Sequence, residues 1–345
     1  MIQKYLKDLV AIPGISAHEK PVREYILKHL KKTRADVEVN NLGCITATFD
    51  GKKKTAGKIL IDAHMDEIGF VVQHIEKNGF LRMVNFGGID PRVVPNQRLE
   101  VHSTKGKRFM GVCGLLPPHV TGGKEATVIP LDQLTVDCGF KTDTEVKKAG
   151  IRVGSAITFP GNFVELENGR FSSKALDDRL GCALLLATAD HLDKKLSDRT
   201  VVISFSTQEE VGAKGINSSI QKILPEYALI VEGTLACDMA GISDDKKVTR
   251  LGEGVAITVA DSSAFVCPDM VDFLVNIAEK HKIKYQFKTP RYGGTNAGEL
   301  YTVVNGIKTG IVAVPARYIH SAVSVSDWSD VRSAENFIKK YIGEL

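Results

Sequence analysis

The sequence lacks any long hydrophobic run. Its longest apolar segments, such as "CALLLATA" over 182–189, are far shorter than the roughly 20 residues that a helix needs to cross a bilayer. The first residues, "MIQKYLKDLVAIPG", space their charged and apolar side chains as a helix does, without the uninterrupted apolar stretch of a signal peptide. Low-complexity segments and fixed-period repeats are also missing. The sequence therefore predicts a protein that has no membrane partner.

The chain also has little excess charge and few cysteines. It carries 45 basic and 41 acidic residues, so its formal net charge is only +4, and the two signs are well mixed. It has no basic stripe of the kind that binds nucleic acid, which excludes that class of partner. The six cysteines form no CxxC pair, as expected for reduced thiols in a cytoplasmic protein. They are Cys44, Cys113, Cys138, Cys182, Cys237 and Cys267.

What the sequence does contain is a change of pattern along its 345 residues, a length for which two domains are expected. A helical start that includes 23–32 is followed by strand-like runs at 37–40, 44–50 and 58–64. From about 68 to 160 almost every run is strand-like, and 143–150 is the one short helical candidate. This stretch predicts a small all-β domain. Its strand-like runs are 69–75, 79–86, 98–104, 109–114, 134–139 and 155–160.

Beyond residue 160, helical and strand-like segments alternate. The strands are continuous apolar runs, which are typical of a sheet covered on both faces. The pattern predicts an α/β fold in which residues 1–67 and 161–345 form one discontinuous domain and residues 68–160 form an inserted β domain. The expected helices are 180–195, 216–223, 269–282 and 331–345, and the expected strands are 200–205, 227–233, 254–260 and 308–314.

Side chains that bind metals recur where the strands of this α/β domain end. Ligands of open α/β sheets bind outside the carboxyl ends of the strands, so these residues are expected to meet in one crevice. Taken singly, each has a simpler interpretation, because a histidine at a strand end is more often structural and paired acids often begin a helix. Five segments that contribute only carboxylate and imidazole groups to one edge outweigh those interpretations. The residues are His64 and Asp66, Asp177 and Asp178, Glu209 and Glu210, Glu232, and His320.

This set of residues predicts a catalytic site with two divalent metal ions. Two histidines, one bridging aspartate and two further carboxylates would hold such a pair, and zinc or cobalt suits these ligands. Asp66 follows His64 by two residues on the same face, where it would orient the imidazole. Of the two adjacent glutamates, Glu209 is expected to act as the general base and Glu210 as a metal ligand.

Six motifs, in this order, resemble the M42 family of metallo-aminopeptidases, and the similarity covers essentially the whole chain. They are "AHMDEIGF", "KALDDRLG", "STQEEVGAKG", "VEGT", "GGTNAG" and "RYIHS". The resemblance implies a three-layer α/β/α phosphopeptidase-like catalytic domain with an inserted PDZ-like all-β domain that serves oligomerisation or access. It also implies a homo-oligomer, built from dimers that often assemble into hollow tetrahedral dodecamers.

The resemblance further implies the reaction and the role of each site residue. The reaction is dinuclear metal-dependent hydrolysis of the N-terminal residue of a peptide, with Glu209 as general base on a metal-bridging water and Asp66 as the acid behind the ligands. Which of the two ligand glutamates lies beside His64 stays open. The implied ligands are His64, Glu232 and Asp177 for one metal, and Asp177, Glu210 and His320 for the other.

The segment around "GGTNAG" is expected to bind the substrate, through Arg291, Gly294 and Asn296. Two residues depart from the family pattern, because Glu232 and Asn296 stand where relatives commonly have aspartate. Lys288 and Arg291, in "FKTPRYGG", either favour an acidic first residue or are exposed loop cations. The sequence leaves the preferred first residue, the native metal and the number of subunits open.

Two other functions are compatible with parts of this pattern. A glycoside hydrolase needs two carboxylates that flank a sugar bond at ~5–9.5 Å, but here the two glutamates are sequence neighbours and the histidines would have no role. A non-catalytic self-assembling shell or binding protein would use the β insert. Such a protein has no need of a complete ligand set with a base beside it.

Overall fold

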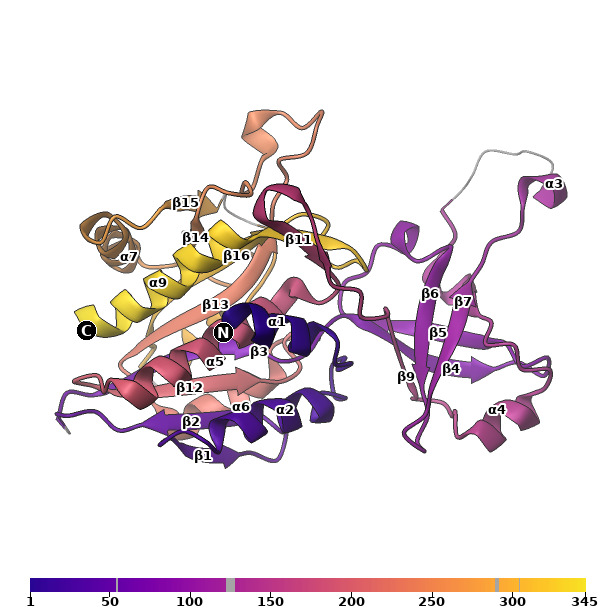
Figure 1. The fold of residues 1–345 in the computed structure, drawn as a ribbon, viewed down its shortest axis with the longest axis horizontal. Helices are drawn as coiled ribbons and strands as arrows, with labels where there is room; N and C mark the ends of the chain where they lie inside the picture. Colours follow the sequence, from indigo (N-terminus) through magenta and orange to yellow (C-terminus); the bar gives the residue numbers. More distant parts are fainter. Residues whose placement is uncertain (54, 122–127, 289–291, 304) are drawn as a thin grey trace.

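A computed structural model of the chain describes residues 1–345 except 54, 122–127, 289–291 and 304. Figure 1 shows a large body built on one twisted sheet and a smaller β unit that projects from one side of it. Both ends of the chain lie on the large body. No helix within the described ranges is both long enough and apolar enough to cross a membrane.

The large body is organised by a sheet of eight strands in the order β1-β2-β12-β3-β13-β16-β14-β15. Its four central strands, β12, β3, β13 and β16, run parallel, and their side chains are buried almost throughout. This burial on both faces explains why these strands are continuous apolar runs in the sequence. The strands are Asp36–Val39 (β1), Ile45–Phe49 (β2), Lys58–His64 (β3), Thr200–Ser206 (β12), Tyr227–Leu235 (β13), Val255–Thr258 (β14), Tyr285–Lys288 (β15) and Lys308–Ala316 (β16).

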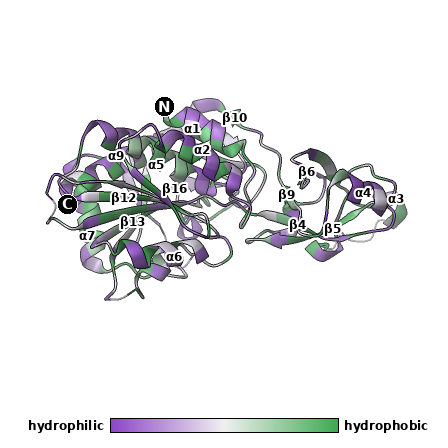
Figure 2. Ribbon diagram, turned by 90° about the horizontal axis from the view of Figure 1, so that it is seen from below, coloured by the Kyte–Doolittle hydropathy of each residue, from purple (hydrophilic) through white to green (hydrophobic). Residues whose placement is uncertain are grey.

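Helices cover both faces of this sheet. Figure 2 shows α1, α2, α5 and α9 above the sheet and α6 below it. Helix α5 is buried around most of its circumference because it lies against the sheet and also contacts α1 and α9. The helices of the body are Ile2–Val10 (α1), Lys20–Leu30 (α2), Leu176–Lys194 (α5), Lys214–Ile223 (α6), Pro268–Lys280 (α7), Ala297–Leu300 (α8) and Trp328–Glu344 (α9).

The projecting unit has its own sheet and its own core. Six strands in the order β7-β6-β9-β4-β5-β8 enclose a cluster of buried side chains that includes Phe70, Leu99, Val136 and Phe159. The strands are Gly69–Ile75 (β4), Leu81–Phe86 (β5), Gln97–His102 (β6), Arg108–Cys113 (β7), Thr135–Val136 (β8) and Ala156–Thr158 (β9), and the helices are Pro118–Thr121 (α3) and Asp143–Ala149 (α4).

A third, three-stranded sheet was not expected from the sequence. It pairs Val164–Glu165 (β10) with Arg170–Ser173 (β11), and β11 in turn with Ser324–Asp327 (β17). These strands are short and rich in serine and acidic residues, so they lack the apolar run by which a strand is recognised. Stacked aromatic rings anchor this sheet to the body, with the Phe171 and Trp328 centroids 4.1 Å apart.

Candidate active site

Polar side chains meet where the central parallel strands end. The last residue of β3 is His64, and it pairs in register with Ser206, the last residue of β12. Glu209 and Glu210 lie in the turn that begins after β12 ends at Ser206, and Glu232 lies in the carboxyl half of β13, the other parallel neighbour of β3. The fourth segment follows β16 and carries His320. Parallel strands direct their carboxyl ends to one edge of a sheet, so four separate segments bring their acids and imidazoles together.

Asp177 lies between the two histidines. Its Oδ1 is 3.2 Å from His64 Nε2, and its Oδ2 is 3.3 Å from His320 Nε2. His64 Nε2 is also 3.4 Å from a carboxylate oxygen of Glu232, and His320 Nε2 is 3.3 Å from one of Glu210. The glutamate beside His64 is therefore Glu232. Two ligands of a tetrahedral zinc ion at about 2.0–2.1 Å lie roughly 3.3 Å from each other, so both groups have the spacing of a shared cation.

The buried oxygens of these glutamates also fit a cation. One oxygen of Glu210 and one of Glu232 are buried and make no hydrogen bond among the described residues, although the Glu210 oxygen is the one that lies 3.3 Å from His320 Nε2. A buried charged oxygen without a partner is costly, and a bound cation would remove that cost. Groups that could hold an ion include His64 with Asp177 and Glu210, and His64 with Asp178 and Glu232.

Asp178 stands beside this centre but is engaged by the backbone. Its carboxylate accepts hydrogen bonds from the backbone N–H of Gly181 at 2.9 Å and of His64 at 3.3 Å. The Asp177–Asp178 peptide bond is cis, and neither residue has helical dihedral angles although both lie in the first turn of α5. Burial and the nearby Glu232 raise the pKa of Asp178 well above its usual value.

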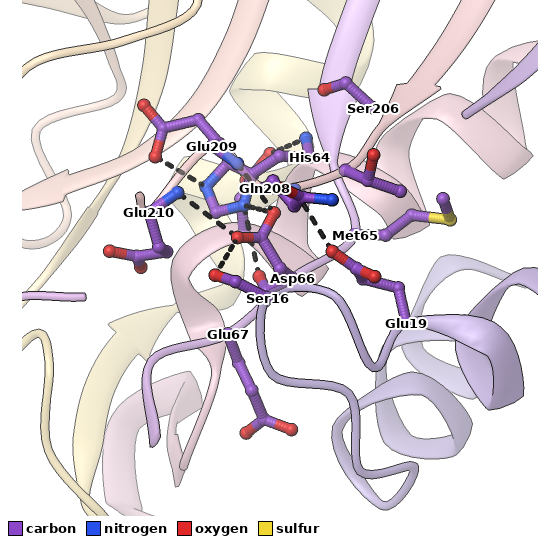
Figure 3. A network of polar contacts seen from close by, with 12 residues as sticks. Ser16, Glu19, His64, Met65, Asp66, Glu67, Ser206, Gln208, Glu209 and Glu210 are labelled. Carbon is purple, nitrogen blue, oxygen red and sulfur yellow. Dashed lines mark hydrogen bonds and ion pairs between the residues drawn. The ribbon is translucent and has the colours of Figure 1, made fainter. Parts of the chain in front are cut away.

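Asp66 contacts several parts of the site (Figure 3). Its carboxylate accepts hydrogen bonds from the backbone N–H of Glu209 at 3.0 Å, from that of Glu210 at 3.2 Å and from the Ser16 hydroxyl at 2.7 Å. The Nδ1 atom of His64 lies 3.1 Å from the Asp66 carbonyl oxygen and 3.4 Å from its carboxylate. Burial opposes the charge on Asp66, but His64 and these donors outweigh it and lower its pKa.

Glu209 is close to the two groups without joining either. Its nearest carboxylate oxygen is 3.9 Å from His64 Nε2. This distance is longer than the four histidine–carboxylate distances given above. Burial raises the pKa of Glu209 well above its usual value, and Glu232 and Glu210 add to this effect. A carboxylate that binds a proton readily and faces a cavity is suited to general base catalysis.

The carboxylates of the site favour the charged form of His320. Burial disfavours a charge on His320, yet the carboxylates of Asp177 and Glu210 outweigh it and raise the pKa of this imidazole to about 11. The His320 Nδ1 atom lies 2.7 Å from the carbonyl oxygen of Gly88, a residue of the projecting β unit. That contact fixes the ring so that Nε2 points toward Asp177.

These side chains open into a cavity of 550 Å³. Of the expected substrate residues, Gly294 lines it, whereas Arg291 lies outside the described residues. Asn296 differs from the expectation of a substrate contact, because its side chain is fully buried and donates to Asp62 at 2.7 Å and to Ser206 at 2.8 Å. The direction of a side chain within a turn depends on packing that the sequence does not display.

Several contributors were missed by the sequence reasoning. Ser16 and Glu19 lie near the start of α2, far from the motifs in the chain. Ser16 donates a hydrogen bond to Asp66, and Glu19 accepts one from the backbone N–H of Gln208, next to Glu209. Gly88 acts through its backbone oxygen, which leaves no trace in the residue type. The only available signal was a helix start with polar residues, which is common without any functional role.

The known proteins that resemble this chain include aminopeptidases. A family model described as M42 glutamyl aminopeptidase matches residues 43–337. The chain is 33% identical to the glutamyl aminopeptidase of Lactococcus lactis, covering 99% of this chain and 95% of the relative. It is 32% identical to the lysyl aminopeptidase of Pyrococcus furiosus, covering 99% and 96%.

The fold also matches a solved structure of Pyrococcus horikoshii TET1 peptidase with a TM-score of 0.89 and 31% identity, over all of both chains. That peptidase is described as assembling into a tetrahedron or a large octahedral shell. The mixed α/β fold expected from the sequence is therefore confirmed at the level of whole-chain similarity.

Proposed function

The chain belongs to the M42 family of metal-dependent aminopeptidases, and from that premise we propose that it removes the N-terminal residue of peptides with two divalent metal ions. The observation that carries this proposal is the position of Asp177, whose two oxygens face His64 and His320. A carboxylate with one oxygen toward each of two ligand groups is suited to bridge two ions.

Each ion would have its own set of protein ligands. Bound zinc or cobalt ions would polarise the scissile carbonyl and lower the pKa of the attacking water. The buried oxygens without partners on Glu210 and Glu232 support one carboxylate at each ion. The proposed sets are His64, Asp177 and Glu232 for one ion, and Asp177, Glu210 and His320 for the other.

Glu209 would move the proton. Its carboxylate accepts a proton from the attacking water as the oxygen of that water forms a bond to the carbonyl carbon. It then donates this proton to the departing amide nitrogen as the C–N bond breaks, so the water is divided between the two products. Its raised pKa favours this exchange, because a base that binds the proton too weakly could not return it.

The carboxylates also account for cleavage at the end of a peptide. A free α-amine would bind near one of the metal ions and beside the acids of the cavity wall, Asp177, Glu209, Glu210 and Glu232. A blocked N-terminus would place a neutral, bulkier group against these charges. We therefore expect N-acetylated substrates not to be hydrolysed.

We further propose that the chain acts as a cytoplasmic homo-oligomer, built from dimers up to a dodecamer, with a PDZ-like β unit. Tetrahedral assembly of the similar TET1 peptidase supports this proposal, as do exposed apolar side chains on the projecting unit. All six cysteines are free, as in proteins of a reducing compartment. The exposed apolar residues are Met110, Val112, Leu115, Leu116 and Val120.

The test is hydrolysis of a panel of aminoacyl-p-nitroanilides by protein loaded with Zn²⁺ or Co²⁺, and by the same protein after chelation. We expect release of p-nitroaniline from free-amine substrates only, and loss of activity when the metal is removed. A glycoside hydrolase would survive the chelator. Metal-loaded, assembled protein that cleaves no member of the panel would instead favour a non-catalytic shell.

A further inference from the structure

Glu19 is a buried carboxylate that belongs to neither metal group. It lies just before α2, and only 2% of its surface is exposed. Over the described ranges it makes no ion pair, it is not part of a group that could hold a cation, and it does not line the 550 Å³ cavity. Burying a carboxylate without a cation carries a substantial free-energy cost, so its contacts show what it stabilises.

The helix that follows does not use this side chain. Glu19 occupies the position before the first residue of α2, where a side-chain oxygen commonly accepts a hydrogen bond from an N–H group of the helix. The side chain of Glu19 makes no such bond. A serine or threonine would cap the helix without burying a charge. The start of α2 therefore does not explain a carboxylate at this position.

The hydrogen bonds of Glu19 lead instead to the turn that carries the proposed base. Its Oε1 accepts from the backbone N–H of Ala17 at 2.9 Å and from that of Gln208 at 3.1 Å (Figure 3). Glu19 and Gln208 are 189 residues apart in the chain, and Gln208 immediately precedes Glu209. A carboxylate accepts hydrogen bonds from N–H groups more strongly than a neutral oxygen does, so this contact joins the two segments firmly.

Gln208 has an uncommon backbone conformation. Its φ is +56°, in the left-handed region that residues other than glycine seldom adopt. Such a conformation persists only where the surrounding structure fixes it. Here the N–H of Gln208 donates to Glu19, and its carbonyl oxygen accepts from the backbone N–H of Lys214 at 3.2 Å. The bond to Glu19 is thus one of two that hold this residue in its left-handed conformation.

Two buried carboxylates hold three successive backbone N–H groups of this turn. Glu19 accepts from Gln208. Asp66, just after the end of β3, accepts from Glu209 at 3.0 Å and from Glu210 at 3.2 Å. The direction of the Glu209 side chain depends on the backbone on both sides of its Cα atom. Glu19 fixes the side before it, and Asp66 fixes Glu209 itself and the side after it.

The segment that carries Glu19 is itself attached beside the end of β3. The Ser16 hydroxyl donates to the Asp66 carboxylate at 2.7 Å. The backbone N–H of Glu67 donates to the carbonyl oxygen of Gly14 at 3.0 Å, and the N–H of Gly14 donates to Glu67 Oε1, also at 3.0 Å. A supporting group fixes a catalytic side chain only when it is held in place itself. These contacts meet that condition for Glu19.

We infer that Glu19 is a positioning residue, which holds the Gln208 backbone so that the Glu209 carboxylate faces the cavity. This role rests on the proposed function and adds to it a residue that supports the general base. Glu19 acts only through the turn, since it lies outside the cavity wall. A displacement of about 1 Å in a catalytic group costs on the order of 100-fold in rate, so loss of this support has a measurable effect.

The first test is a crystal structure of metal-free Glu19→Ala beside that of the metal-free parent. Without an acceptor for its N–H, Gln208 should leave its left-handed conformation, and the Glu209 carboxylate should move by about 1 Å or more. His64 and Asp177 should keep their positions, because the contacts that hold them do not involve Glu19. A Glu209 carboxylate that does not move would overturn the positioning role and leave the proposed function intact.

The second test compares kcat and KM for Glu19→Ala, Glu19→Gln and a matched control, Asp330→Ala. Asp330 is also a buried carboxylate that accepts from two backbone N–H groups, those of Gly252 and Gly254, both at 2.7 Å. We expect Glu19→Ala to lower kcat about 10- to 100-fold, with KM within about threefold and the metal content unchanged. Glu19→Gln should keep most of kcat, because its amide oxygen can accept both bonds. Asp330→Ala should lower thermal stability without lowering kcat.

Three results of this comparison would overturn the positioning role. One is an equal kcat for Glu19→Ala and Asp330→Ala at matched loss of stability. Another is a Glu19→Gln protein as slow as Glu19→Ala, since the charge and not the acceptor would then matter. The third is a lower metal content in Glu19→Ala, because the effect would then act through the ligand Glu210.

A double mutant shows whether the effect of Glu19 depends on Glu209. In a Glu209→Gln background the base is already absent, so adding Glu19→Ala should lower kcat by less than about threefold. A further loss of about tenfold or more would overturn the role, because Glu19 would then act through another group. A metal-loaded parent that cleaves no substrate would overturn the proposed function, and the crystal structures would still decide whether Glu19 places the Glu209 carboxylate.

Discussion

Replacing Glu209 by glutamine separates the general base from the metal ligands. The substitution keeps the shape of the side chain and leaves the backbone N–H of Glu209 bonded to Asp66. It removes the group that accepts a proton. Because the Glu209 carboxylate is 3.9 Å from His64 Nε2, no contact of the two ligand groups is lost. The matched variant is Glu210→Gln, whose carboxylate is 3.3 Å from His320 Nε2.

The expected size of the effect follows from the role of a general base. A positioned base contributes about 10²–10⁴-fold to kcat, and a 10³-fold loss corresponds to about 4 kcal/mol of transition-state stabilisation. We expect Glu209→Gln to lose about that much in kcat and to retain two metal ions per chain. Glu210→Gln should also be inactive, but it should retain about one ion because it has lost a ligand charge.

The assay measures kcat on the best p-nitroanilide of the panel together with metal content by atomic emission after dialysis. Thermal unfolding without metal gives a third measurement. Since burial and neighbouring acids raise the pKa of Glu209, its ionised form is unfavourable in the metal-free fold, and the glutamine variant should unfold at a higher temperature near pH 8. A Glu209→Gln protein with kcat within about threefold of the parent, or with metal content as low as that of Glu210→Gln, would refute the assigned roles.

Chelation should lower the midpoint of thermal unfolding, since a ligand at about 1,000 times its Kd stabilises the fold by roughly 4 kcal/mol, and added Zn²⁺ or Co²⁺ should restore it. Burial would raise the pKa of Asp238, but two hydrogen bonds from Arg317, at 2.6 and 2.7 Å, outweigh it and lower the pKa. This contribution is present above about pH 4 and is lost as the pH falls further, so in urea unfolding Asp238→Asn should cost about 1–2 kcal/mol at pH 7 and less at pH 3. Gly87→Ala should destabilise the fold by about 1 kcal/mol or more and also lower kcat. Gly87 has a φ of +81°, and the added Cβ would lie 2.5 Å from Ile68 and 3.1 Å from Glu210. Calorimetry measures the loss of stability, and steady-state kinetics measures kcat.

The elements of the large body were mostly predictable from the sequence. Apolar runs such as 58–64 and 200–205 correspond to β3 and β12, and the expected helices at 180–195 and 269–282 correspond to α5 and α7. The strand β15 and the sheet of β10, β11 and β17 were missed, because strands of two to four residues are too short to show a period. The inserted sheet lies within 68–160, while its resemblance to a PDZ domain stays a prediction.

The membership of the site was also largely predictable, because acids and imidazoles at the ends of parallel strands converge by topology alone. The geometry around each atom was not. Glu232 and Glu210 are both glutamates after apolar runs, and both of their strands, β13 and β12, are neighbours of β3. The direction of each side chain in the folded chain puts Glu232 beside His64 and Glu210 beside His320. Asn296 was expected to contact the substrate, but its side chain donates a hydrogen bond to the buried Asp62 instead.

The sequence by itself determined which acids and histidines are available for chemistry. Residue types and the ends of apolar strands are local properties, and both can be read from the six ordered motifs. Tertiary structure alone decided which oxygens of Asp177 face which histidine, that Lys288 is buried in a cavity wall, and that Glu19 reaches the backbone before Glu209. Burial, distance and side-chain direction depend on contacts between residues far apart in the chain, and for that reason only the folded chain could define them.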